Sequence, residues 1–262
     1  MNNHTITGSA SADIPPQVLR SFTVQEVAKR LDHAVLRPEY TAIDVAEQAA
    51  MCVAHGVGCI CVRPVDVATA ARLVLDKGVV VSSVIGFPHG NHRREVVALE
   101  ARLAIEDGAR ELDMVMHTSA FFSGDDATVR SCIAAVVAEA VPHGVMVKVI
   151  LETCLLLPKQ IVRACCLAEE AGANFVKTST GFVAGRDQII GATPESVRVM
   201  LDTVGTRLGV KASGGIRTWE DAVGYLAMGC TRIGVGDAAA ILEMATPEQQ
   251  LNYPQGSSKG SY

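Results

Sequence analysis

The sequence is dominated by eight short apolar runs that alternate with segments of helical periodicity. The runs are typical of buried strands and span residues 33–36, 58–62, 79–85, 111–116, 145–151, 174–177, 208–212 and 231–235. The helical segments follow them at residues 41–55, 65–77, 93–107, 126–140, 159–171, 195–204, 218–228 and about 237–244. Strict alternation requires parallel strands, because each helix returns the chain to the same end of the sheet.

Eight such units favour a closed (β/α)8 barrel over an open, doubly wound sheet. A barrel of this kind usually takes about 250 residues, and the chain has 262. A doubly wound sheet would need a glycine-rich turn after its first strand, whereas Arg37-Pro38-Glu39 stands there. We therefore predict one α/β domain, a (β/α)8 TIM barrel over residues 22–250, with a flexible segment at 1–21 and a flexible tail at 251–262.

Composition excludes several classes of protein. The net charge is −5 and no basic run occurs, so neither nucleic acid nor an anionic membrane is an expected partner. Residues 1–15 lack the apolar core of a secretory signal, and no uncharged apolar run reaches the ~18 residues of a membrane-spanning helix. The eight cysteines are scattered without zinc-site spacing, which is typical of reduced thiols in the cytoplasm and predicts no metal.

Three of the seven lysines lie inside predicted strands. Lys148, Lys177 and Lys211 each follow apolar residues whose burial is expected. Lysine is almost never fully buried unless it is paired. One such lysine could sit at an edge or extend its amine to water, but three on successive strands indicate a cavity lined by amines. In an α/β barrel that cavity would lie at the C-terminal ends of the strands.

Neighbouring lysines in such a cavity suit covalent catalysis. A second cation and partial removal from water both favour the neutral amine of a lysine, and a neutral amine attacks carbonyl carbons to form a Schiff base. Asp113 lies on the same strand face as Glu111 and could move protons between the amines. The alternative is structural, with the lysines paired to Asp113 or Asp32 and Asp113 acting as a counter-ion.

Glycines follow the last two predicted strands, where barrels often hold a phosphate group. Ser213-Gly214-Gly215-Ile216-Arg217 follows the seventh strand, and Gly234-Val235-Gly236-Asp237 follows the eighth. Their N–H groups could bind an anion, with Arg217 as a charged helper. Cys61 and His89 also lie near strand ends. We favour a packed thiol for Cys61, and for His89 a role in its turn is as well supported as contact with substrate.

Together these motifs resemble those of the 2-deoxyribose-5-phosphate aldolase family of class I aldolases. The resemblance extends from about residue 31 to residue 241, over most of the chain. It rests on Leu31-Asp32-His33, Gly86-Phe87-Pro88-His89-Gly90-Asn91, Glu111-Leu112-Asp113, Val147-Lys148-Val149-Ile150-Leu151-Glu152-Thr153, Phe175-Val176-Lys177-Thr178-Ser179-Thr180-Gly181-Phe182 and Val210-Lys211-Ala212-Ser213-Gly214-Gly215-Ile216-Arg217.

The resemblance implies a (β/α)8 barrel that needs no cofactor or metal. It implies reversible cleavage of 2-deoxy-D-ribose 5-phosphate to acetaldehyde and D-glyceraldehyde 3-phosphate. Lys177 would form the Schiff base, Lys211 would favour its neutral amine, and Asp113 would relay protons. Supporting residues would be Lys148, Asp32, Thr180 and the terminal Tyr262. The phosphate group would be bound by Gly181, Gly214, Gly215, Arg217, Gly234 and Gly236.

Three departures from the family concern substrate preference more than the reaction. Asp237 stands where the family commonly has serines that help to hold phosphate, and its charge would repel an anion unless its carboxylate caps the next helix. The loop 183–190 is longer than usual, and Ala34 replaces a usual threonine. We therefore predict a weaker preference for the phosphorylated sugar than a serine-bearing relative would show.

Other functions remain open at this point. A related Schiff-base aldolase could prefer unphosphorylated or other aldehydes, and a transaldolase-like enzyme would use the same lysines. A catalytically silent sugar-phosphate sensor is less favoured, because Lys177, Lys211 and Asp113 are all present. The expected partners are small aldehydes and sugar phosphates, the expected location is the cytoplasm, and a homo-oligomer is left open.

Overall fold

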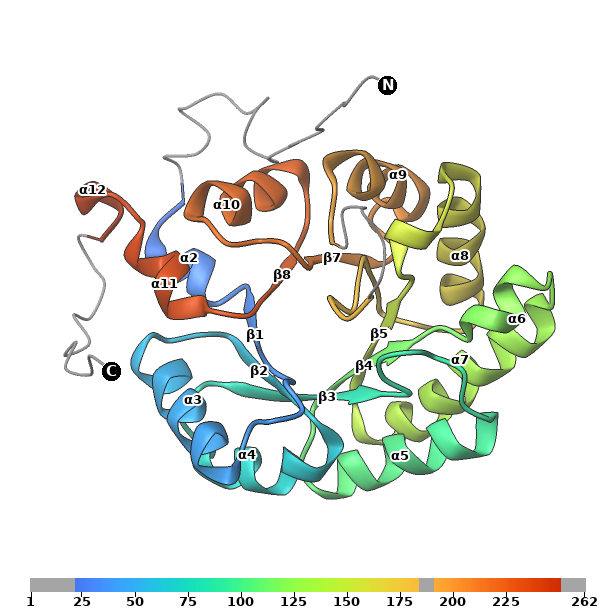
Figure 1. Cartoon of the computed structure of the whole chain (residues 1–262), viewed down its shortest axis with the longest axis horizontal. Coiled ribbons are helices and arrows are strands. Elements are labelled where there is room, and N and C mark those ends of the chain that lie inside the picture. The colour runs from blue at the N-terminus through green and yellow to red at the C-terminus, as the bar shows by residue number, and fades with distance from the viewer. Residues whose placement is uncertain (1–21, 184–190, 251–262) are drawn as a thin grey trace.

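The computed structural model describes residues 22–183 and 191–250. Within them, eight parallel strands form a closed barrel in the order β1 to β8, and β8 pairs back onto β1 (Figure 1). The predicted fold class is therefore confirmed. The strands are β1 (Leu31–Val35), β2 (Cys59–Val62), β3 (Val80–Ile85), β4 (Glu111–Val115), β5 (Met146–Ile150), β6 (Phe175–Lys177), β7 (Gly209–Ser213) and β8 (Arg232–Val235).

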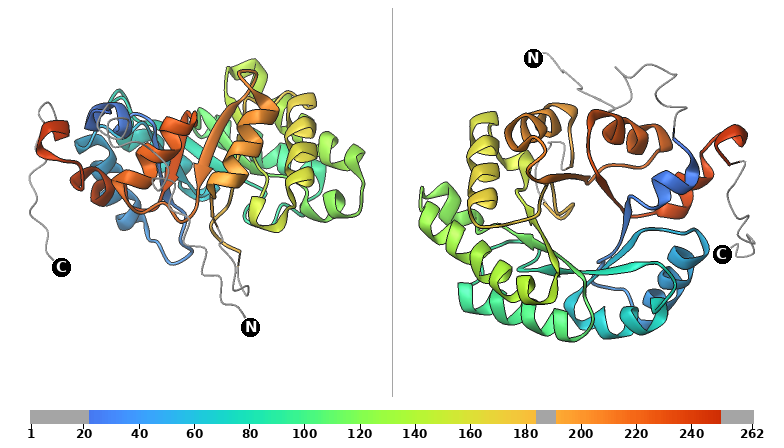
Figure 2. Two further views of the ribbon diagram at one scale, coloured as in Figure 1. Left: turned by 90° about the horizontal axis from the view of Figure 1, so that it is seen from above. Right: turned by 180° about the vertical axis from the view of Figure 1, so that it is seen from behind.

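Helices form an outer ring around the strands, which the view from behind also shows (Figure 2, right). The longer helices of the ring are α3 (Ala42–Ala54), α4 (Val67–Val74), α5 (Arg94–Glu106), α7 (Asp126–Ala140), α8 (Pro158–Glu170), α9 (Pro194–Val204) and α10 (Trp219–Met228). Shorter elements are α2 (Val24–Ala28), α6 (Thr118–Phe122), α11 (Ala238–Glu243), α12 (Pro247–Gln250) and the 3-10 turns η1 (Pro64–Asp66), η2 (Val141–His143) and η3 (Thr153–Leu155).

Local sequence sets where several helices begin. Thr23, Thr41, Thr193 and Thr218 are N-caps whose side-chain oxygens accept backbone N–H groups of the first turn. The sequence did not predict α6, because five residues are too few to show helical periodicity. The helix expected over residues 65–77 divides into η1 and the shorter α4.

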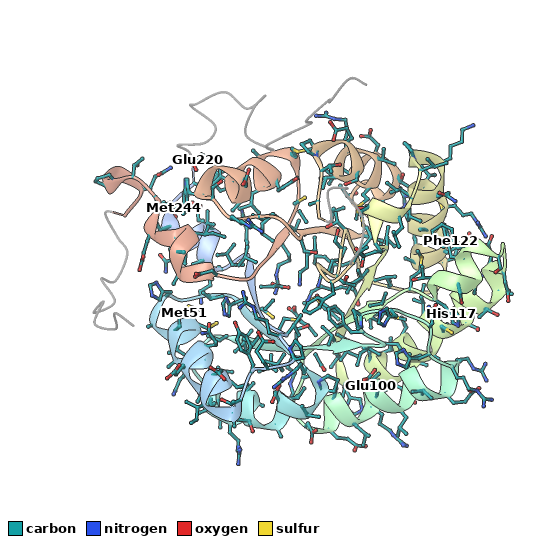
Figure 3. All side chains as sticks on the ribbon, viewed as in Figure 1. Met51, Glu100, His117, Phe122, Glu220 and Met244 are labelled. Atoms are coloured by element: carbon teal, nitrogen blue, oxygen red, sulfur yellow. The ribbon has the colours of Figure 1, made fainter. Side chains whose placement is uncertain are left out.

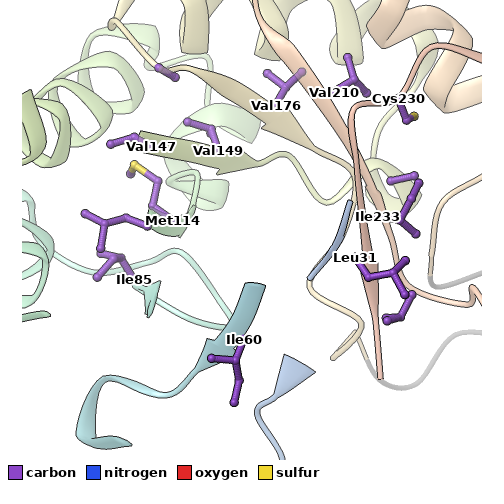
Figure 4. Close-up of a cluster of buried hydrophobic side chains, with 14 of the residues drawn as sticks. Leu31, Ile60, Ile85, Met114, Val147, Val149, Val176, Val210, Cys230 and Ile233 are labelled. Carbon is purple, nitrogen blue, oxygen red and sulfur yellow. The ribbon is translucent and has the colours of Figure 1, made fainter. Parts of the chain in front are cut away.

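Alternation along the strands separates an apolar shell from a polar barrel interior. Val147, Val149, Val176 and Val210 point outward and join one hydrophobic cluster between strands and helices (Figure 4). The residues between them in sequence therefore point into the barrel, since successive side chains of a strand face opposite sides. Lys148 is one of these inward residues and is fully buried.

Among the described residues, no helix is long and apolar enough to cross a membrane. The segments predicted to be flexible, 1–21 and 251–262, lie outside the described residues, as do residues 184–190 of the loop noted in the sequence at 183–190. Tyr262, a predicted supporting residue, is among them.

Candidate active site

Strand register brings the predicted catalytic residues together. Lys177 of β6 and Lys211 of β7 are Cα partners across neighbouring strands. Asp113 of β4 and Lys148 of β5 are partners in the same way. Partners in register point to the same side of the sheet, so four charged side chains meet inside the barrel. Each is at most 4 % exposed.

Asp113 is the centre of this group. Its Oδ2 atom accepts hydrogen bonds from Lys177 Nζ and Lys211 Nζ, both at 2.7 Å. Its Oδ1 atom accepts from Lys148 Nζ at 2.8 Å and from Ser82 Oγ at 3.0 Å. One carboxylate therefore links all three strand lysines and has both oxygens engaged.

A second layer of charges lies beneath Asp113. Lys211 donates to Asp32, and Lys148 donates to Glu111 at 2.5 Å. Arg232 joins these two carboxylates, since its Nε contacts Asp32 Oδ1 at 2.8 Å and its Nη1 contacts Glu111 Oε1 at 2.8 Å. Lys148 also lies 3.4 Å from Asp32. We call these seven residues, Asp32, Glu111, Asp113, Lys148, Lys177, Lys211 and Arg232, the barrel charge cluster.

Mutual attraction keeps Asp32, Asp113, Lys148 and Lys211 ionised. Burial alone would favour the neutral form of Asp113, but the neighbouring lysine charges outweigh it and hold the pKa of Asp113 well below its ordinary value. The pKa of Asp32 is lowered in the same way against burial, first by Lys211 and then by Lys148. Burial also opposes the charge on Lys148 and Lys211, yet Asp113 and Asp32 raise the pKa of both lysines.

The count of charges singles out Lys177. The cluster holds three carboxylates and four basic groups, so one basic group can be neutral while the rest balance. Lys148 contacts three carboxylates of the cluster and Lys211 contacts two, but Lys177 contacts only Asp113 among the residues described. Lys177 therefore has the fewest ion-pair partners of the three lysines in the cluster.

Two carboxylates of the cluster lie close to Cys59 in an arrangement that could hold a metal ion. The ligand atoms of Asp32, Cys59 and Glu111 lie within 4.8 Å of one another. Both carboxylates are already paired with Arg232 and Lys148. We therefore assign these groups to the charge cluster rather than to a metal site.

A cavity of about 910 Å³ opens above the cluster. Lys177, Lys211 and Asp32 line it together with Cys61. It extends past the glycines after β7 and β8 toward α3, where Met51 forms part of its wall (Figure 3). A buried amine with a single counter-ion is thus within reach of a small molecule.

Comparison with known proteins agrees with this chemistry. A family model described as DeoC/LacD family aldolase matches residues 26–234. The chain belongs to this family. The resemblance seen in the sequence is therefore confirmed.

Relatives support the assignment over nearly their whole length. Deoxyribose-phosphate aldolase of Thermococcus gammatolerans is 45% identical over 222 residues, which cover 84% of this chain and 96% of the relative. The protein of the same name from Geobacillus sp. is 44% identical with the same coverage. A solved structure, a tetrameric deoxyribose phosphate aldolase from Aeropyrum pernix, matches with a TM-score of 0.77 and 35% identity, covering 84% of this chain and 91% of that one.

The six residues predicted to bind phosphate all line the cavity. Gly181, Gly214 and Gly215 have φ values of 80°, 84° and 79°, a conformation that favours glycine. A Cβ atom added at Gly181, Gly215 or Gly236 would meet no atom within 4 Å, so these glycines border open space. Arg217 is exposed at the cavity wall. Their binding of phosphate stays a prediction.

Asp237 combines the two positions that the sequence presented as alternatives. Its Oδ1 atom accepts the Ala240 N–H at 3.0 Å and so caps α11. The residue also lines the cavity. Capping therefore does not remove the carboxylate from the predicted phosphate end, and its effect on substrate preference stays a prediction.

The remaining candidate residues, Thr180, Cys61 and His89, differ in their contacts and in their relation to the cavity. Thr180 lines the cavity, and its N–H and hydroxyl both donate to Glu152. Cys61 packs in a small apolar group with Leu36, and burial raises the pKa of its thiol. His89 is exposed and is not among the described residues that line the cavity; its carbonyl accepts a hydrogen bond from Thr118.

Sequence reasoning assigned no role to Arg232, Ser82 or Glu152. Arg232 had a usable signal, because it lies two residues before Gly234 in the eighth strand and so faces the same side. Ser82 and Ser83 are the polar residues of β3, and neither one forms a recognisable motif. Glu152 reaches Thr180 only through the tertiary fold.

Proposed function

We propose that this chain is a class I aldolase that reversibly cleaves 2-deoxy-D-ribose 5-phosphate to acetaldehyde and D-glyceraldehyde 3-phosphate. The observation that carries the proposal is the position of Lys177, which lines the cavity and shares its single cluster carboxylate, Asp113, with Lys211. The substrate is supported by the names of the relatives.

In the first step, the neutral amine of Lys177 attacks C1 of the open-chain sugar. Loss of water from the adduct leaves an iminium, whose carbon–nitrogen double bond can accept an electron pair. Lys211, held as a cation by Asp113 and Asp32, favours the neutral amine that begins the reaction.

In the second step, the C2–C3 bond breaks. The C3 hydroxyl loses its proton and becomes the aldehyde of glyceraldehyde 3-phosphate, while the bonding pair moves into the iminium and forms an enamine. A proton then adds to C2, and water releases acetaldehyde and returns the amine of Lys177. Asp113 has a low pKa and is a weak base by itself, so we assign it the relay of protons among Lys177, Lys211 and a water or hydroxyl group.

The phosphate end of the substrate is proposed to lie against the glycines after β6, β7 and β8. Their N–H groups would bind the phosphate oxygens, and the exposed Arg217 would add charge. The same wall carries Asp237, whose negative charge would weaken this binding.

We also propose a cytoplasmic homo-oligomer. The eight free cysteines support a reducing compartment, and the Aeropyrum pernix relative is a tetramer. Sedimentation equilibrium of the purified chain measures the assembly, and a purely monomeric mass at micromolar concentration would contradict it.

The reaction is tested by measuring cleavage of 2-deoxyribose 5-phosphate and of 2-deoxyribose side by side. Release of glyceraldehyde 3-phosphate and acetaldehyde in equal amounts is expected from the wild type and not from Lys177→Met. Turnover of a ketone donor with no release of acetaldehyde would indicate a transaldolase-like enzyme, and absence of any turnover would indicate a sensor.

A further inference from the structure

Glu152 lies two residues beyond β5 and is buried, although it does not line the cavity with the described residues that do. Its φ is 58°, a left-handed conformation that is uncommon for residues other than glycine. Strained residues of this kind often occur where the side chain must be placed for function. The carboxylate of Glu152 accepts hydrogen bonds mainly from Thr180, and its Oε1 atom also accepts the Cys154 thiol at 3.8 Å.

Three hydrogen bonds join the two residues. The Thr180 N–H donates to Oε1 and Oε2 of Glu152 at 3.3 and 3.2 Å, and the Thr180 hydroxyl donates to Oε2 at 2.5 Å. An ionised carboxylate has no hydrogen, so the hydrogen of the short contact belongs to Thr180. Burial raises the pKa of Glu152, while the hydrogen bonds from Thr180 and the charge of Lys177 oppose that rise.

This arrangement fixes what Thr180 can offer to a ligand. A hydroxyl has one hydrogen and two acceptor lone pairs. The hydrogen is donated to Glu152, and one lone pair accepts the Phe182 N–H at 3.1 Å. One lone pair remains, and Thr180 lines the cavity. Thr180 can therefore accept a hydrogen bond from a ligand but cannot donate one.

The preceding residue, Ser179, carries a second hydroxyl, which is less accessible than that of Thr180. Ser179 also lines the cavity, is fully buried, and its Oγ atom has no hydrogen-bond partner among the residues that the structure describes. That Oγ atom is closed to solvent, so the pairing with a ligand concerns Thr180. A ligand hydroxyl would satisfy the remaining lone pair of Thr180, whereas an alkyl chain would leave it unpaired at a cost in binding.

We propose that Glu152 is a positioning residue that fixes Thr180 as a hydrogen-bond acceptor, so that the cavity selects substrates presenting a hydroxyl group to Thr180. The inference rests on the proposed aldolase function, in which D-glyceraldehyde 3-phosphate carries such a hydroxyl on C2. Sites built to pair with a substrate hydroxyl discriminate strongly against the analogue that lacks it.

The test uses the synthetic direction, with acetaldehyde as donor and two acceptors. These are D-glyceraldehyde 3-phosphate and 3-phosphooxypropanal, which lacks the C2 hydroxyl, and the ratio of their kcat/KM values is the hydroxyl preference. Thr180→Val and Glu152→Gln should each lower this ratio about 10-fold, as expected for loss of one hydrogen bond. Gln keeps the size of Glu but replaces one of its two acceptor oxygens with a hydrogen donor and removes the charge, so Thr180 loses part of its fixed pairing. The double variant should lower the ratio no further, because Glu152 acts through Thr180.

Glu100→Gln is the matched control. Glu100 lies on α5 (Figure 3), and its Oε2 atom accepts the Gly86 N–H at 2.7 Å in a different loop. This change should leave the hydroxyl preference at its wild-type value. Glu152→Asp keeps a charged acceptor and should retain more of the preference than Glu152→Gln, which makes it the deciding variant if Glu152→Gln does not fold.

Two results would overturn the proposal. One is a Glu152→Gln enzyme whose kcat/KM falls equally for both acceptors. The other is a double variant whose effects on the ratio simply add. Borohydride trapping of wild-type enzyme with acetaldehyde separates this failure from failure of the aldolase function. If the wild type is trapped at Lys177 but the Glu152 variants keep the wild-type hydroxyl preference, only the role of Glu152 is removed. If the wild type is not trapped at all, the aldolase function itself is removed.

Discussion

Replacement of Lys211 by leucine should move the pH dependence of cleavage toward alkaline pH. The Nζ atoms of Lys177 and Lys211 both lie 2.7 Å from one oxygen of Asp113, so the two nitrogens are at most about 5.4 Å apart. Two unit charges at that distance interact by about 3 kcal/mol at an effective dielectric constant of about 20. Without the charge of Lys211, the neutral amine of Lys177 is harder to reach by this amount, or about two pH units.

The charge balance of the cluster predicts the same shift toward alkaline pH. In the wild type, a neutral Lys177 leaves three carboxylates facing three basic groups. In Lys211→Leu it would leave three carboxylates facing only Lys148 and Arg232, so the protonated form of Lys177 is favoured.

Initial rates of cleavage measured from neutral to alkaline pH, with glyceraldehyde 3-phosphate detected by a coupled dehydrogenase, provide the assay. The Lys211→Leu rate at neutral pH should fall about 100-fold and recover in part as the pH rises. Lys211→Arg keeps the charge and is the control, so its profile should stay near that of the wild type even if its rate falls. An unshifted profile for Lys211→Leu, or equal shifts in both variants, would refute the electrostatic argument.

Three further predictions concern other parts of the site. Asp113→Asn should still form the Schiff base but slow exchange of the acetaldehyde methyl protons about 10²–10⁴-fold; exchange at the wild-type rate, followed by NMR in deuterated water, would remove Asp113 from the relay. Gly234→Ala places a Cβ 2.7 Å from Ser213 Cβ and 3.2 Å from Lys211 Cε, and should destabilise the fold by about 1–3 kcal/mol while lowering kcat, as thermal melts and kinetics would show; an unchanged kcat would argue against close packing over Lys211. Asp237→Ser keeps a good N-cap on α11 and should lower KM for 2-deoxyribose 5-phosphate by up to about 10-fold without changing KM for 2-deoxyribose; a loss of thermal stability with both constants unchanged would make Asp237 a cap only.

The barrel and the inward lysines could be predicted because both depend on periodicity. Eight alternating units specify a parallel closed sheet, and a lysine between valines on a buried strand has to face the interior. Lys148 faces the barrel interior, whereas its neighbours Val147 and Val149 face the helices. The glycines after β7 and β8 were found for the same reason, since their place in the repeat puts them at the cavity wall.

Contacts between distant parts of the chain could not be predicted. Arg232 and Asp32 are 200 residues apart and meet only because the barrel closes. Glu152 and Thr180 are 28 residues apart, and Glu152 has a left-handed backbone that no propensity indicates. From the sequence, capping of the last helix and a place at the phosphate end were alternatives for Asp237. In the structure Asp237 caps α11 and also lines the cavity.

The central claim is that Lys177 is the covalent residue, and borohydride trapping tests it most directly. Wild-type enzyme incubated with acetaldehyde and sodium borohydride should gain one ethyl group, and peptide mapping by mass spectrometry should place it on Lys177. Lys177→Met should remain unmodified under the same conditions, while Lys211→Arg should still be labelled on Lys177. An adduct mapped to Lys211 or Lys148 in the wild type would contradict the account.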